Sequence, residues 1–295
     1  MPNHVTNILK ISGDEELVKR ILVEIEGPYD EEEDCRSFID FNKILPMPDS
    51  LNITSGSTTD SGIAVLRYRA GDKSKILEML TWHWVKEEGI TDPDALVERL
   101  IEKGSANLVE AQAALDNVEK YGVADWYGWA NKYWGTKWNA YSQEKFENEI
   151  SFQTAWSTPY PLIVALSLKY PDAEFNVRYA DEDLGHNVGE YTLQNGQIID
   201  ENDPEGGSEE ALLMAIDIIG YEDYISDRCF EIDPEYSVDD LEDYDKKWIS
   251  IAYRKEILDD YPKCVLDYLI VLALEDENYE FAQKVKETTS WYEIE

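Results

Sequence analysis

Residues 149–179 read EISFQTAWSTPYPLIVALSLKYPDAEFNVRY, and this stretch decides the fold. Its two ends, 149–156 and 174–179, alternate apolar and polar side chains, which is the pattern of half-buried β-strands. Between them, Thr158 and Pro159 precede a long apolar run, and proline is favoured in the first turn of a helix. The stretch therefore predicts a strand, a helix and a second strand that pack together.

The residues on either side extend the same pattern. Residues 136–141 and 190–193 alternate as strands, and Asn195-Gly196 is a hairpin signal before another strand at 197–199. A sheet of about five strands with one packed helix is the simplest arrangement of these elements. We therefore predict an α+β domain over residues 134–200.

The first ninety residues predict a small α/β unit of their own, over residues 1–90. Residues 4–11 alternate as a strand, and Asp14 can cap an amphipathic helix that runs to about Glu26. Residues 37–44 and 63–69 alternate as two further strands, and residues 73–86 carry helical spacing.

A helical insert is predicted over residues 91–133. It begins at Asp92, with Pro93 in the first helical position, and is broken once near Gly104. The insert leads into YGVADWYGWANKYWGTKWNAY at 121–141. We expect the closely spaced Trp and Tyr side chains there to form one apolar cluster that anchors the following domain.

The last part of the chain, residues 201–295, predicts an acidic helical region. Helical spacing covers 209–219, 238–259 with a break near Asp245, 263–274 and 279–288. Its charge is extreme, because residues 181–245 contain 22 Asp and Glu and one basic residue, Arg228. The whole chain thus reads as an α+β protein with an N-terminal α/β unit, a helical insert, a central sheet domain and this C-terminal region.

The net charge limits the partners. The chain has 63 Asp and Glu against 26 Lys and Arg, a net charge of −37. This field repels nucleic acid and anionic membranes, and it speeds association with basic surfaces, of which a DNA-binding groove is the commonest large example. Solubility alone is the other interpretation of such a charge.

The cysteines and the apolar runs indicate a reducing, non-membrane setting. Cys35, Cys229 and Cys264 are widely spaced, so neither a disulfide framework nor a zinc site is expected. No signal peptide is expected, and the longest apolar run, at 265–274, is too short to span a bilayer. We expect a cytoplasmic protein.

A search for catalytic patterns predicts a protein that is not an enzyme. The one histidine among carboxylates, His186, follows Asp181 in a spacing that fits no calcium loop, so no functional metal and no cofactor are expected. There is no GxSxG elbow or Gly-rich phosphate loop, and no cysteine neighbours a histidine in sequence. A carboxylate pair among abundant Trp and Tyr leaves a carbohydrate-active enzyme as an alternative.

Several motifs resemble a mostly uncharacterised phage and plasmid family whose later domain is ferredoxin-like. They are MPNHVTN at 1–7 with Gly13, WGTKWNAY at 134–141, FQTAWSTP at 152–159, and YADEDLG at 179–185 with Asn187 and Gly189. The resemblance covers roughly residues 1–45 and 121–200. It implies a ferredoxin-like fold for the central domain and supplies no catalytic residues.

Within that group, the length, acidity and helical C-terminal region resemble the phage-encoded Gabija anti-defence proteins. That resemblance implies a homo-oligomer that surrounds a bacterial defence nuclease-helicase complex in the host cytoplasm and keeps it from DNA, without binding nucleic acid itself. Steric enclosure is favoured over DNA mimicry, since aromatic side chains suit a packed interface. A DNA-mimic inhibitor of another host protein is a further alternative. The candidate partner-binding residues are Asp181, Glu182, Asp183, Glu222, Asp223, Asp239, Asp240, Glu242 and Asp243.

Overall fold

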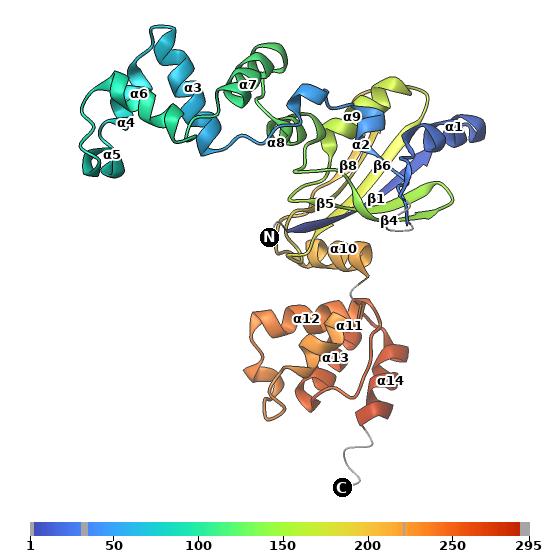
Figure 1. The fold of residues 1–295 in the computed structure, drawn as a ribbon. Helices are drawn as coiled ribbons and strands as arrows, with labels where there is room; N and C mark the ends of the chain where they lie inside the picture. The colour runs from blue at the N-terminus through green and yellow to red at the C-terminus, as the bar shows by residue number, and fades with distance from the viewer. Residues whose placement is uncertain (1–2, 31–34, 221, 290–295) are drawn as a thin grey trace.

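The computed structural model describes residues 3–30, 35–220 and 222–289 and is organised around one antiparallel sheet (Figure 1). Six strands lie in the order β4-β5-β1-β6-β7-β8. They are β1 (His4–Ser12), β4 (Tyr141–Phe146), β5 (Glu149–Ala155), β6 (Glu174–Asp181), β7 (Val188–Gln194) and β8 (Gln197–Asn202). With helices on both faces of this sheet, the predicted α+β class is confirmed.

Alternation along the central strands gives the sheet one buried face and one face that is partly covered. On one face α1 (Glu15–Ile25) and α9 (Tyr160–Lys169) pack over a core that includes Leu9, Phe152 and Phe175. On the other face α10 (Glu209–Ile219) packs against Ala180 and Val188. Since Ile8 and Leu9 are adjacent in β1 and contact different cores, the strand is sandwiched between the two helical layers.

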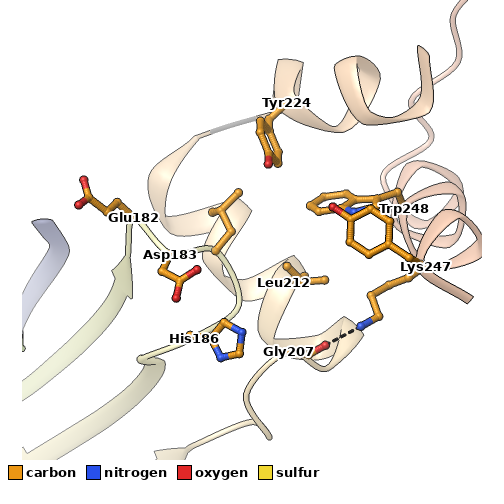
Figure 2. A pocket seen from close by; sticks show the side chains of 10 residues that line it. Glu182, Asp183, His186, Gly207, Leu212, Tyr224, Lys247 and Trp248 are labelled. Carbon is orange, nitrogen blue, oxygen red and sulfur yellow. Dashed lines mark hydrogen bonds between the residues drawn. The ribbon is translucent and has the colours of Figure 1, made fainter. Parts of the chain in front are cut away.

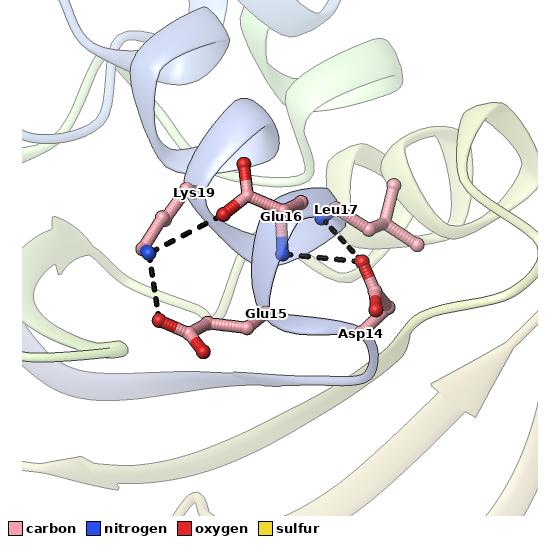
Figure 3. A network of polar contacts seen from close by, with 5 residues as sticks. All are labelled: Asp14, Glu15, Glu16, Leu17 and Lys19. Carbon is pink, nitrogen blue, oxygen red and sulfur yellow. Dashed lines mark hydrogen bonds and ion pairs between the residues drawn. The ribbon is translucent and has the colours of Figure 1, made fainter.

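The start of α1 follows the predicted chemistry (Figure 3). Asp14 Oδ1 accepts hydrogen bonds from the backbone N–H groups of Glu16 and Leu17, at 3.1 and 3.2 Å. Lys19 pairs with Glu15 and Glu16 one turn back. The cap satisfies two of the N–H groups that a helix start leaves unpaired, which is why the helix begins here.

Residues 49–121 form a helical body on one side of the sheet domain (Figure 1). Its elements are η1 (Asp49–Leu51), α3 (Ser57–Arg69), α4 (Ser74–Met79), α5 (His83–Glu87), α6 (Pro93–Glu102) and α7 (Leu108–Tyr121). Most of these helices share a core of Val65, Ile76, Met79, Leu96 and Leu100. Gly62 lets α3 approach α7 closely, because a Cβ there would clash with the carbonyl oxygen of Asn107.

The chain returns to the sheet through α8 (Trp126–Trp129) and a π-helical turn, η2 (Ala130–Trp134). Trp129 and Trp134 are buried in the main core, while Tyr127 is exposed. The expected aromatic cluster therefore exists in part: some of its rings anchor the sheet domain and others remain at the surface.

Beyond α10, the C-terminal helices form a separate core on the far side of the sheet (Figure 1). They are α11 (Glu222–Phe230), η3 (Val238–Asp240), α12 (Asp243–Arg254), α13 (Lys263–Glu275) and α14 (Tyr279–Thr289). The predicted helix at 238–259 breaks at Leu241 and ends at Arg254. No helix in the described ranges is long and apolar enough to cross a membrane.

Two predicted strands of the N-terminal unit are wrong. Residues 37–44 contain the short helix α2 (Phe41–Ile44), capped by Asp40, and residues 63–69 lie inside α3. The alternation of apolar residues at 63–69 was misleading, since burial at Thr59, Gly62 and Val65 follows helical spacing against α7. Likewise, residues 136–140 precede β4 and are not a strand. The helical spacing predicted for residues 73–86 is confirmed, as two short helices.

The predicted α/β unit at 1–90 has no large sheet of its own. β1 instead pairs antiparallel with both β5 and β6, more than 130 residues later, and lies at the centre of the six strands. Apart from β1, the described part of residues 1–90 contributes only the two-residue strands β2 (Tyr29–Asp30) and β3 (Cys35–Arg36). The physical reason is that one face of β1 is buried in the main core while Ile8 on its other face is partly covered by the α10 layer, and a two-layer N-terminal unit could supply only one of these contacts.

Candidate functional site

The candidate acidic residues fall into two groups on different elements. Asp181, Glu182 and Asp183 lie at the end of β6 and the start of the β6–β7 loop. Asp239, Asp240, Glu242 and Asp243 lie in η3 and at the start of α12. Glu222 and Asp223 begin α11, and their side chains lie outside the described residues.

Asp181 is a structural residue, because its carboxylate is already bound within the fold. It is only 4% exposed, and it accepts hydrogen bonds from Asn3 Nδ2, Asn187 Nδ2 and the backbone N–H of Asp183, at 3.0, 3.0 and 2.9 Å. A buried carboxylate needs such donors to offset its desolvation. Glu182 and Asp183 are exposed and can reach a partner.

Around the start of α12, part of the acidity serves to begin helices. Asp240 Oδ2 accepts from both the N–H and the hydroxyl of Ser237, at 2.9 and 2.6 Å, and these hydrogen bonds lower the pKa of Asp240. Asp245 Oδ2 accepts from the backbone N–H of Glu242 in a second capping box. Both arrangements place negative charge at a helix N-terminus, where the helix dipole favours it.

A cavity of about 370 Å³ lies between the β6–β7 loop and the C-terminal helices, and of the candidate acids Glu182 and Asp183 line it. Figure 2 shows Asp183 and His186 on the loop side, opposite Tyr224, Lys247 and Trp248. The carboxylate of Glu182 points away from that wall. The lining residues are Glu182, Asp183, Leu184, His186, Gly207, Leu212, Tyr224, Tyr244, Lys247 and Trp248.

One wall of this cavity is aromatic. The ring centroids of Tyr224 and Tyr244 lie 5.5 and 6.3 Å from that of Trp248, both edge to face. Trp248 is 4% exposed, and its Nε1 donor has no hydrogen-bond acceptor among the described residues. Lys247 Nζ donates to the backbone oxygen of Gly207 at 2.7 Å, so one cation of the chain already borders the cavity.

This combination suits recognition of a side chain with an apolar stem and a polar head. Aromatic faces attract cations, and the planar guanidinium of arginine can stack on a ring while it pairs with a carboxylate such as Asp183. The chain itself uses this chemistry nearby, since the guanidinium of Arg228 lies 4.7 Å from the ring centroid of Tyr224. No group of three or more His, Cys, Asp or Glu in the described residues is arranged to hold a metal ion.

The sequence predicted Asp183 as a site residue but did not predict the aromatic wall of the cavity. Tyr224 lies in α11, and Tyr244 and Trp248 lie in α12, after the intervening residues 231–242, so no local spacing connects all three. The available signal was that aromatic residues interrupt an acidic stretch, at Tyr224 and again at Tyr244. Asp239, Glu242 and Asp243 are exposed and do not line the cavity.

The fold and the cavity describe an α+β protein with a ferredoxin-like sheet domain and a cavity at its junction with the C-terminal helices. Residues 137–222 match the family model described as the ferredoxin-like domain in Api92-like protein. This range runs from before β4 to the start of α11, and it confirms the ferredoxin-like fold that the resemblance implied.

Among solved structures, the crystal structure of a protein api92 from Yersinia pseudotuberculosis is similar to this chain. The alignment covers 70% of this chain and 100% of that chain, at 13% sequence identity and a TM-score of 0.33. No curated protein matches the chain.

Proposed function

We propose that this chain is a phage anti-defence protein that binds a bacterial nuclease-helicase complex of the Gabija type and blocks its access to DNA. It acts in the host cytoplasm by occupying a surface, without catalysis, and as a homo-oligomer. The nature of the partner comes from the sequence resemblance. The observation that carries a binding role is the set of exposed carboxylates beside an aromatic cavity at the sheet-helix junction.

The charge supports a basic partner surface. A nuclease must carry a basic path for DNA, and a chain with a net charge of −37 associates with such a path rapidly. Asp183 in the cavity, and Asp239, Glu242 and Asp243 on the helices, are exposed and in position to meet basic side chains. An arginine from the partner fits the cavity chemistry described above.

Enclosure of the partner is favoured over close imitation of DNA. A DNA mimic needs its carboxylates free to replace phosphates, whereas Asp181 is buried and Asp240 and Asp245 cap helices. Exposed ion pairs contribute on the order of 0 to 1 kcal/mol each, while a buried aromatic anchor contributes roughly 2 to 4 kcal/mol. On this basis the charge guides the approach and packed contacts hold the complex.

The test uses the purified chain and a purified Gabija nuclease-helicase complex. We expect the two to co-elute and the chain to suppress DNA cleavage at near-stoichiometric amounts, with no DNA binding by the chain alone. A variant that carries Glu98→Gln, Glu102→Gln and Glu119→Gln on the helical body controls for a general effect of the net charge. It removes three exposed charges that lie away from the junction. Full cleavage with a large excess of folded chain would reject the proposal.

A further inference from the structure

A tryptophan in a left-handed backbone conformation ends β5. Trp156 has φ +76°, a region that bulky residues rarely adopt and that costs free energy unless the surroundings enforce it. Its N–H donates to the backbone oxygen of Asn3, and its carbonyl accepts from Asn187 Nδ2, both at 3.0 Å. The fold thus fixes this backbone from both sides, yet the side chain is 41% exposed. Core packing therefore does not account for the strain.

The exposed indole belongs to a group of rings around one lysine. The Nζ atom of Lys137 lies 4.8 Å from the Trp156 ring centroid and 4.5 Å from that of Trp138. The ring of Tyr127, itself 43% exposed, meets Trp156 edge to face at 6.3 Å. We call these four residues the Trp156 surface. Two indole faces hold the ammonium group in place, so its charge is presented in a restricted position.

A second backbone distortion brings Lys137 beside Trp156. The π-helical turn η2 ends at Gly135, where φ is +81° and a Cβ would clash with Pro161. The next residue, Thr136, donates to the backbone oxygen of Ala155 at 2.7 Å, and Ser157 Oγ donates to that of Gly135 at 2.6 Å. These bonds tie the two segments together. π-helical turns and strained residues both concentrate at functional sites.

The two segments that form this surface also lack acidic residues. Residues 126–143 and 150–171 contain no Asp or Glu, in a chain that has 63 in 295 residues. Their basic residues are Lys132, Lys137 and Lys169. Burial and, after it, the charge of Glu182 raise the pKa of Tyr141, so Glu182 is one acidic neighbour on that side. An acidic partner would be repelled elsewhere on the chain, and here it meets an aromatic surface with a fixed cation.

From this geometry we infer that the Trp156 surface is a protein-docking site for a carboxylate flanked by apolar side chains. It would hold a surface of the defence complex outside the DNA path, and in this the inference rests on the proposed function. Trp156, Trp138 and Tyr127 supply apolar contact area with little rotamer freedom to lose, and Lys137 pairs with the carboxylate. The acidic helices then guide the chain to its partner, and this surface retains it.

The experiment measures dissociation of the full-length chain from the purified Gabija complex. Trp156→Gly removes the ring and suits the left-handed backbone, which offsets part of the lost packing, so the variant should still fold. We expect its dissociation rate to rise roughly tenfold or more, as for a hot-spot aromatic. The matched control is Trp82→Ala, because Trp82 is also exposed and has Lys75 over its ring, but its φ is an ordinary −69°. The control should leave the rate unchanged.

Variants of Lys137 test whether this lysine pairs with a carboxylate of the partner. Lys137→Glu should weaken binding more than Lys137→Met, because it adds repulsion to the loss of the pair. Equal effects of these two variants, or an unchanged dissociation rate in Trp156→Gly, would overturn the inference while leaving the proposed function in place. So would a change in the oligomeric state of the isolated Trp156→Gly chain with no change in complex dissociation, since the surface would then join copies of this chain. Failure of the parent chain to bind would overturn both.

Discussion

The acids at the end of β6 and those around the start of α12 look alike in sequence and differ in the folded chain. Of Asp181, Glu182 and Asp183, the first is buried with its oxygens bonded inside the sheet domain. The acids of the second group are all exposed, and Asp240 caps a helical turn; the group consists of Asp239, Asp240, Glu242 and Asp243. Acidic density therefore does not separate carboxylates that hold the fold together from those that can meet a partner. Burial and hydrogen-bond partners do.

The largest expected effect tests the buried member of that comparison. Asp181→Ala leaves three donors without their acceptor, and we expect it to lower the free energy of unfolding by about 3 kcal/mol. Asp183→Ala, two residues away and exposed, should change it by less than about 0.5 kcal/mol. Denaturant unfolding of both variants measures the difference. Equal stability of the two would show that Asp181 is not structural.

The next effect concerns the six candidate acids of the C-terminal region. Replacing Glu222, Asp223, Asp239, Asp240, Glu242 and Asp243 by their amides should slow association with the defence complex several-fold and leave dissociation nearly unchanged. The measurement is binding kinetics at low and high salt, where the difference in association rate should shrink as salt screens the charges. A dissociation rate that rises more than about tenfold would instead favour DNA mimicry.

The fold could be predicted from sequence wherever local signals agreed. The alternation and helix start within residues 149–179, the Asn195-Gly196 hairpin and the Asp14 cap all lie close to their expected positions. The central place of β1 could not be predicted, because its partners are more than 130 residues away and pairing over that distance leaves no local pattern. The strand predicted for residues 63–69 was wrong. The β-branched and aromatic residues there suit a strand, but packing of this segment on α7 favours a helix.

The candidate site was predicted less completely, for a related reason. Asp183 was found by charge, but burial of Asp181 depends on Asn3 and Asn187, which approach from other strands and loops. The strain at Trp156 is invisible in sequence, since a positive φ is signalled by Gly or Asn and is rare for Trp. The absence of acids from residues 126–143 and 150–171 was visible, and it becomes informative only when Lys137 and Trp156 are seen together.

A smaller effect tests the aromatic wall of the cavity beside the β6–β7 loop. Trp248→Phe removes an Nε1 donor that has no acceptor in the described residues and keeps an aromatic side chain, so stability should fall by less than about 1.5 kcal/mol. Trp248→Ala, the comparison variant, should cost more than Trp248→Phe, because it leaves a cavity in the C-terminal core. Thermal or denaturant unfolding separates the two. If Phe costs as much as Ala, the donor has a partner in the folded protein.

The smallest effect separates Asp240 from its neighbour Asp239. Hydrogen bonds from Ser237 lower the pKa of Asp240 in the folded state, so its contribution to stability is present above the unfolded pKa and is lost as the pH falls through the lower folded pKa. Asp240→Asn should therefore unfold at lower denaturant than the parent chain near neutral pH. The gap between them should close in acid, below the folded pKa. Asp239→Asn makes the same change of charge, but Asp239 has no bonds to Ser237. The difference between the denaturation midpoints of this variant and the parent chain should therefore be smaller at neutral pH. Matching denaturation midpoints for the two variants at every pH would mean that charge alone, and not the capping geometry, sets the role of acids at this helix start.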